Sequence, residues 1–127
     1  MSNKKILVAD DEIHIVHVVA MKLRNNGFDV ITAENGAESL KLACSEKPDV
    51  IVTDFQMPAM TGLEMIKELR KHSDMADVPV IMLTARGFAI ESKQMQELKI
   101  FRCVSKPFSP KDLLANVEEA LLQSVTV

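Results

Sequence analysis

Five short apolar runs recur along the 127-residue chain, and each is followed by apolar residues at helical spacing. The runs are continuous rather than alternating, which is typical of strands buried on both faces of a parallel sheet. Helices between consecutive strands supply the crossovers that parallel strands require. The pattern predicts strands over Lys5–Ala9, Val30–Ala33, Val50–Thr53, Val78–Leu83 and Phe101–Ser105.

Capping residues mark several of the intervening helices. Thr61 with Glu64 three residues later has the pattern of a capping box, and Asn35 opens an earlier helix in the same way. The segment Ala89–Leu98 has few apolar anchors, so its low packing makes it a candidate for movement. Right-handed crossovers then predict an α/β, flavodoxin-like (βα)5 three-layer sandwich, with a five-stranded parallel sheet of order 2-1-3-4-5.

Length and composition indicate one ordinary folded unit. The chain is 47% hydrophobic and 26% charged, with a formal net charge of -3, which argues against direct nucleic-acid binding. The apolar run Ile6–Ala9 is too short for a signal peptide or a membrane span. Cys44 and Cys103 form no CxxC pair, as expected in a reducing compartment. We expect a cytoplasmic protein and a single domain over residues 1–127.

Polar residues follow the strands whose carboxyl ends meet where the winding direction reverses, which is where sites of open α/β sheets lie. The second strand, an edge of the sheet, ends without such a group. We therefore expect the remaining strand ends to converge on one site. Its residues would come from Asp10, Asp11 and Glu12, from Asp54, from Thr84, and from Lys106 and Pro107.

Carboxylates this close repel one another, so positive charge must hold them. Lys106 supplies one charge, and a hard divalent cation such as Mg²⁺ suits the oxygen donors better than zinc does. An aspartate beside such an ion can attack phosphorus, which makes Asp54 a candidate nucleophile and Thr84 a hydroxyl donor to a phosphoryl oxygen. A lone strand-end aspartate is about as often a plain helix N-cap, and a lone lysine is usually solvated. Their combination at the expected site location indicates function.

These residues resemble the response-regulator receiver domain of two-component signalling, over nearly the whole chain. The motifs that carry the resemblance are Asp10-Asp11, D-F-Q-M-P-A-M-T-G from Asp54 to Gly62, Thr84-Ala85, and Lys106-Pro107-Phe108.

The resemblance implies that a histidine kinase or phosphotransfer protein donates a phosphoryl group to Asp54. It implies that Asp11, Asp54 and the backbone carbonyl of Gln56 ligate Mg²⁺, with Asp10 acting largely through water. It also implies that Lys106 pairs with the phosphoryl group and that the bond before Pro107 is cis. Such a domain is a signalling protein that catalyses only its own phosphorylation and dephosphorylation.

The resemblance further implies a switch, in which the Thr84 hydroxyl follows the phosphate and a strand-five aromatic turns inward. The face made by helix four, strand five and helix five is then reshaped. Cys103 occupies the position of that aromatic here, and Phe101 lies two residues earlier, so on a strand it points to the same face. We expect either that Phe101 is a displaced switch aromatic or that the switch lacks one. Gln56 and Arg86 stand where the family tunes the access of water to the phosphoryl group.

His14 and His17 follow the acidic pair on the first helix, where kinases commonly dock in this family, so partner contact is a better interpretation of them than metal binding. An aspartyl-nucleophile phosphohydrolase would need a general acid where Gln56 stands. An FMN carrier would not place acidic residues at its phosphate loop. A receiver-like binding module that is not phosphorylated stays open.

We expect no output domain in this chain and a downstream protein or output domain as the partner. The sequence leaves the kinase, the stimulus and a phosphorylation-dependent dimer open.

Overall fold

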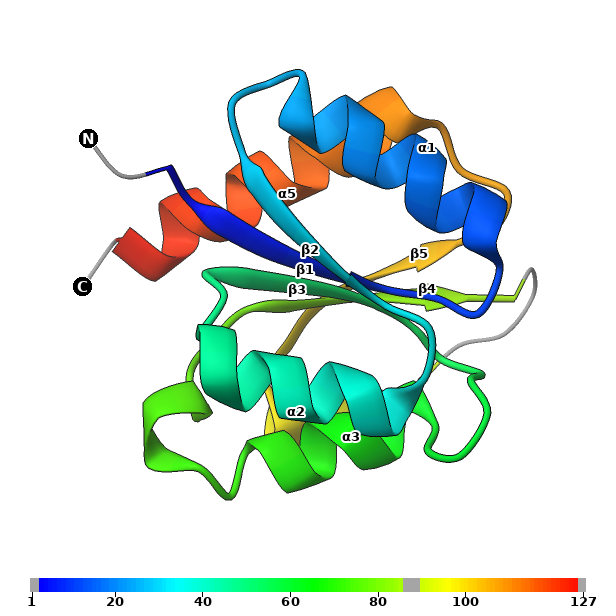
Figure 1. Ribbon diagram of the computed structural model, residues 1–127. Coiled ribbons are helices and arrows are strands. Elements are labelled where there is room, and N and C mark those ends of the chain that lie inside the picture. The colour runs from blue at the N-terminus through cyan, green and yellow to red at the C-terminus, as the bar shows by residue number, and fades with distance from the viewer. Residues whose placement is uncertain (1–2, 86–89, 126–127) are drawn as a thin grey trace.

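The computed structural model describes residues 3–85 and 90–125, which form a parallel sheet with helices on both faces (Figure 1). The strand order is β2-β1-β3-β4-β5, which confirms the predicted topology. The strands are β1 Lys5–Ala9, β2 Asp29–Ala33, β3 Val50–Asp54, β4 Val80–Thr84 and β5 Ile100–Ser105. The helices are α1 Ile13–Arg24, α2 Gly36–Glu46, α3 Gly62–Leu69, α4 Ser92–Leu98 and α5 Pro110–Val125, with the short 3-10 turn η1 at Ser73–Met75.

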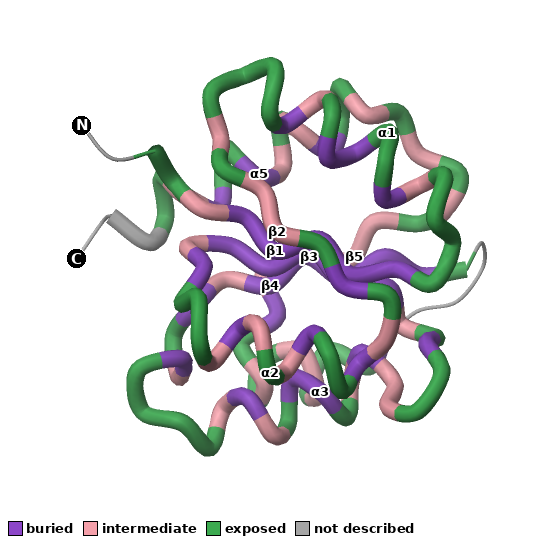
Figure 2. Tube along the Cα trace, in the orientation of Figure 1, coloured by how far each residue is buried: buried purple, intermediate pink, exposed green. Residues whose placement is uncertain are grey.

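Two apolar cores lie on opposite faces of the sheet, so the central strands are buried throughout (Figure 2). One core packs α2, α3 and α4 against the sheet, and the other packs α1 and α5. All five residues of β3 and of β4 are buried. This explains why these strands read as continuous apolar runs in the sequence.

The predicted caps of α2 and α3 are confirmed. The Asn35 side chain accepts a hydrogen bond from the Glu38 backbone N–H at 2.8 Å. Thr61 and Glu64 form a reciprocal capping box at the start of α3. These bonds satisfy backbone donors that a helix start would otherwise leave free.

The fourth helix is the weakest, as predicted, although it is shorter than expected. It begins at Ser92, contains no buried residue and has no side-chain hydrogen bond at its N-cap, Glu91. Ile90, one of the expected anchors, is buried but lies before the helix.

Strand β5 contains an irregularity that changes one prediction. Val80 pairs with Ile100 and Ile81 pairs with Arg102, so Phe101 is an extra residue, a β-bulge. Phe101 packs in the core under α1 and α5, whereas Cys103 packs in the core under α4. The expectation that the two side chains share a face is therefore wrong.

Candidate functional site

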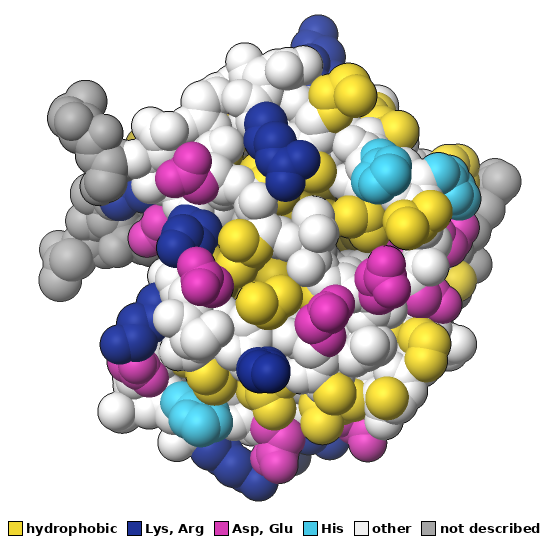
Figure 3. All heavy atoms as spheres, in the orientation of Figure 1, with side chains coloured by type: hydrophobic (Ala, Val, Ile, Leu, Met, Phe, Trp, Pro, Cys, Tyr) yellow, Lys and Arg dark blue, Asp and Glu magenta, His cyan; other side chains and the backbone are white. Residues whose placement is uncertain are grey.

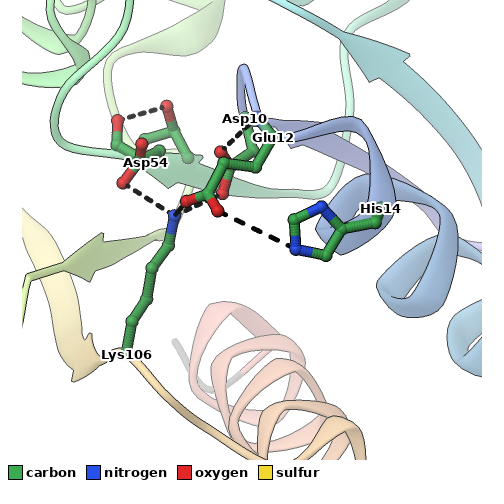
Figure 4. Close-up of polar contacts among 6 residues, drawn as sticks. Asp10, Glu12, His14, Asp54 and Lys106 are labelled. Carbon is green, nitrogen blue, oxygen red and sulfur yellow. Dashed lines mark hydrogen bonds and ion pairs between the residues drawn. The ribbon is translucent and has the colours of Figure 1, made fainter.

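The carboxyl ends of β1, β3, β4 and β5 bring the predicted polar side chains together. Backbone hydrogen bonds hold these ends in place: Phe55 N–H donates to Leu83 O at 2.8 Å, and Lys106 N–H donates to Thr84 O at 2.8 Å. Thr84 itself is 1% exposed at the end of β4. The Lys106–Pro107 peptide bond is cis, and the Lys106 side chain extends toward β1 and β3 (Figure 4).

Three aspartates form the acidic centre of the site. Asp10, Asp11 and Asp54 each offer a carboxylate oxygen, and these oxygens all lie within 4.8 Å of one another. Asp10 and Asp54 are buried, while Asp11 is exposed. An all-oxygen donor set with one open side suits Mg²⁺, which keeps several waters when it binds to proteins. The residues present therefore fit the expected cation.

Gln56 lies beside this acidic centre. A hollow of about 290 Å³ is lined by Asp11, Gln56, Met57, Pro58 and Thr61. The structure thus brings Gln56 and Asp11 to one surface, although they are 45 positions apart (56 − 11) in the sequence. Arg86, the other predicted rate-tuning residue, lies outside the described residues.

A close backbone contact shapes the loop after Asp54. A Cβ atom on Gly62 would lie 2.2 Å from the backbone oxygen of Asp54, well inside any allowed contact. The Gly62 N–H donates to Phe55 O at 2.8 Å, which returns the chain directly over the end of β3. Glycine is therefore required for α3 to begin this close to Asp54.

Lys106 is the positive charge of the site. Its Nζ lies 2.8 Å from Asp10 Oδ2, 2.9 Å from Glu12 Oε1 and 3.4 Å from Asp54 Oδ1 (Figure 4). Glu12 was expected near the site as part of the acidic run after β1, but no role there was predicted for it from the sequence. Its contact with Lys106, 94 positions away, depends on tertiary structure that the acidic run alone does not specify.

Burial and neighbouring charge shift the pKa values of these groups. Burial, reinforced by the charge of Asp10, raises the pKa of Asp54 to about 6, with Lys106 opposing the change. The Asp10 pKa is raised by burial, again against the effect of Lys106. Burial alone would lower the pKa of Lys106, but its ion pairs with the carboxylates of Asp10, Glu12 and Asp54 outweigh burial and raise it. Burial thus disfavours the ionised forms of Asp10 and Asp54, while Lys106 stays charged.

The predicted switch positions occupy different surroundings. Cys103 Sγ lies 3.9 Å from Met95 Sδ of α4, so this side chain does face the weak helix. Phe101 instead has the Arg102 guanidinium 4.9 Å from its ring centroid, and Arg102 donates to Asn116 of α5 at 2.6 Å. Phe101 is thus part of a contact between β5 and α5 rather than a neighbour of Cys103.

His14 and His17 lie on α1 outside the acidic centre. His14 Nε2 is 3.8 Å from Glu12 Oε2, and among the described residues neither histidine belongs to a group that could hold a metal ion. Figure 3 shows histidine and hydrophobic side chains side by side over α1. The exposed Ile13, Val18 and Met21 contribute to this apolar surface.

Among the described residues, no helix is both long and apolar enough to cross a membrane.

Comparison with known proteins identifies the class to which this fold and site belong. Residues 6–118 match the response regulator receiver domain family, and the chain belongs to that family. The resemblance found in the sequence is therefore confirmed.

Individual relatives sharpen this assignment. The chain is 43% identical over 122 residues to the alkaline phosphatase synthesis transcriptional regulatory protein PhoP of Bacillus subtilis, covering 96% of this chain and 50% of that protein. It is 41% identical over 121 residues to the probable transcriptional regulator ycf27 of Cyanophora paradoxa, covering 95% of this chain and 49% of that protein. The chain thus spans about half the length of these curated relatives.

Solved structures show the same fold. The chemotaxis response regulator CheY4 of Vibrio cholerae matches with a TM-score of 0.87 at 33% identity, covering 94% of this chain and 100% of that chain. The receiver domain of the Francisella response regulator 1452 matches with a TM-score of 0.85 at 33% identity, covering 96% of this chain and 99% of that chain.

Proposed function

We propose that this receiver domain is a switch that accepts a phosphoryl group on Asp54 with Mg²⁺. The observation that carries the proposal is the position of the Asp54 carboxylate, which shares the acidic centre and has the Lys106 ammonium at 3.4 Å. A pKa of about 6 leaves most of this carboxylate ionised near neutral pH, as a nucleophile requires.

The proposed reaction transfers a phosphoryl group from a phosphohistidine of a histidine kinase or phosphotransfer protein. An Asp54 carboxylate oxygen attacks phosphorus, the new O–P bond forms, and the P–N bond breaks with its electron pair leaving on the imidazole. Lys106 offsets the negative charge of the phosphoryl oxygens, and the Thr84 hydroxyl donates to one of them. Mg²⁺ held by Asp10, Asp11, Asp54 and the Gln56 carbonyl would neutralise the carboxylates and the incoming phosphoryl group.

The proposed response is a change at the face made by α4, β5 and α5. Cys103 supports this because its thiol contacts Met95 of α4, a helix with no buried residue. The switch would then act through Thr84 and Cys103 without an aromatic at the Cys103 position. The tuning role of Gln56 and Arg86 remains a proposal, and unchanged phosphoryl lifetimes in variants of both would contradict it.

The proposed partners follow from the same site. The donor would dock over the exposed apolar and histidine surface of α1. Because the curated relatives are transcriptional regulators, we propose that an output domain or separate protein reads the switched face and that this chain itself binds no nucleic acid. A cytoplasmic location stays a prediction from the sequence.

Intact-mass measurement after incubation with acetyl phosphate and Mg²⁺ tests the proposed function. We expect the wild type to gain one phosphoryl group, the gain to disappear with EDTA, and Asp54→Asn to gain none. Asp49→Asn is a matched control on the far end of β3, where Asp49 Oδ2 accepts the Lys5 N–H at 2.8 Å. A wild type that gains no phosphoryl group would instead support a binding module.

A further inference from the structure

The Lys106 ammonium is shared unequally among three carboxylates. Asp10 and Glu12 lie at 2.8 and 2.9 Å from Nζ, whereas the phosphoacceptor Asp54 is the most distant at 3.4 Å. The lysine is therefore held closest to residues that receive no phosphoryl group. Figure 4 shows the Lys106 Nζ between the carboxylates of Asp54 and Glu12.

Glu12 is fixed at that helix start by its backbone. It is the N-cap residue of α1, and its N–H donates to Asp10 Oδ1 at 2.9 Å. Its carbonyl accepts hydrogen bonds from Ile15 and Val16. One side-chain oxygen contacts Lys106, and the other lies 3.8 Å from His14 Nε2. The backbone thus places the carboxylate in reach of Lys106.

Burial distinguishes Glu12 from the other two partners. Its side chain is 48% exposed, compared with 0% for Asp10 and 10% for Asp54. The residue also lines an open, largely apolar hollow of about 480 Å³ together with Lys106, Pro107 and Phe108. Water can therefore replace Lys106 at Glu12, whereas a buried carboxylate such as Asp10 would be left unpaired.

We infer that Glu12 is a positioning residue that competes with the phosphoryl group for Lys106. The inference rests on the proposed phosphorylation of Asp54. In the unmodified protein Glu12 holds the ammonium beside Asp10, and on phosphorylation Lys106 turns to the more highly charged phosphoryl oxygens while Glu12 becomes hydrated. Glu12 thereby weakens the hold of Lys106 on the phosphoryl group and limits the stability of the phosphorylated state.

Titration with beryllofluoride, a phosphoryl mimic, at saturating Mg²⁺ tests this inference. Binding is followed by ¹⁹F NMR for the wild type, Glu12→Gln, Glu12→Asp and the matched surface control Glu118→Gln on α5. We expect Glu12→Gln to bind about three- to fivefold more tightly, the factor expected for a partly exposed ion pair. Glu12→Asp, which keeps the charge but loses reach, should also bind more tightly, and Glu118→Gln should match the wild type.

A double-mutant cycle separates competition for Lys106 from simple charge repulsion. In a Lys106→Ala background, Glu12→Gln should give no further gain in beryllofluoride affinity. An equal gain with and without Lys106, or no gain in either Glu12 variant, would overturn the inference. Failure of the wild type to bind beryllofluoride or to accept a phosphoryl group would instead contradict the proposed function.

Discussion

Helices α3 and α4 lie on the same face of the sheet, yet they are held in opposite ways. Helix α3 begins with a capping box and buries Gly62, Met65, Ile66 and Leu69. Helix α4 lacks a side-chain cap and buries none of its residues. Helix α3, after Asp54, is thus held by packing and a cap that α4, after Thr84, lacks. We therefore expect the proposed response to phosphorylation in α4 rather than in α3.

One side chain links the two helices. Arg70, the C-cap of α3, donates to Leu98 O at 2.8 Å, to Lys99 O at 3.0 Å and to Met75 O at 2.9 Å. The C-terminal end of α4 is thus tied to α3, while its N-terminal end has no comparable bond from Glu91. Movement of α4 should therefore be a rotation about its anchored end.

The largest expected effect comes from adding one methyl group at Gly62, the first residue of the well-packed helix α3. Gly62→Ala should lower the free energy of unfolding by at least about 3 kcal/mol, because its Cβ would meet the Asp54 oxygen at 2.2 Å. Urea unfolding followed by far-UV circular dichroism measures this, since the chain has no Trp or Tyr. Gly27→Ala is the comparison, because φ is +91° there but nothing lies within 4 Å, so its cost should be about 1 kcal/mol. Equal losses would contradict the close contact.

A second prediction concerns the carboxylate of Asp54, at the end of β3, the strand that precedes α3. The folded-state pKa of Asp54 is about 6, raised above its usual value near 3.8 by burial and Asp10, so the folded state binds the proton more tightly. Its contribution to stability is present below about pH 4 and is lost as the pH rises through about 6. In EDTA, the wild type should lose on the order of 2 kcal/mol relative to Asp54→Asn between pH 4 and pH 7. If the free energies of unfolding of the two proteins changed in parallel with pH, the raised pKa of Asp54 would be contradicted.

The link between the helices should contribute an intermediate effect. Arg70→Met keeps most of the side-chain stem and removes all donors to the three carbonyls, at a cost of about 2 kcal/mol. Hydrogen exchange should rise mainly at the C-terminal end of α4. Lys67→Met, at an exposed position on α3, should change stability by less than about 0.5 kcal/mol. Unchanged exchange in α4 of Arg70→Met would show that the anchor is not effective.

The smallest prediction adds the cap that α4 lacks. Glu91→Ser should stabilise the helix start by about 0.5 kcal/mol, because serine is a favoured N-cap. Glu97→Ser places the same residue within α4 and should destabilise it slightly, since serine is a poorer helix former than glutamate. Hydrogen exchange of the first turn of α4 distinguishes the two variants. A shift of the same sign in both would mean that capping does not limit this helix.

Much of the fold and site could be predicted because the deciding features are local or repeated. Continuous apolar runs predicted the parallel sheet, and Thr61 with Glu64 predicted the start of α3. The positions of Asp10, Asp54 and Lys106 at strand ends predicted that these residues lie close together. Phe101 was misplaced because one extra residue in β5 reverses the face of the side chains before it, and no sequence pattern marked that bulge. Glu12 was expected near the site, but its ion pair with Lys106 was missed because that contact depends on where two separate loops meet.

The most direct test of the switch compares hydrogen exchange in α3 and α4 with and without Mg²⁺ and beryllofluoride. We predict that exchange in α4 changes while exchange in α3 stays the same, and that Asp54→Asn shows neither change. An equal change in both helices, or a change in α3 alone, would contradict the account.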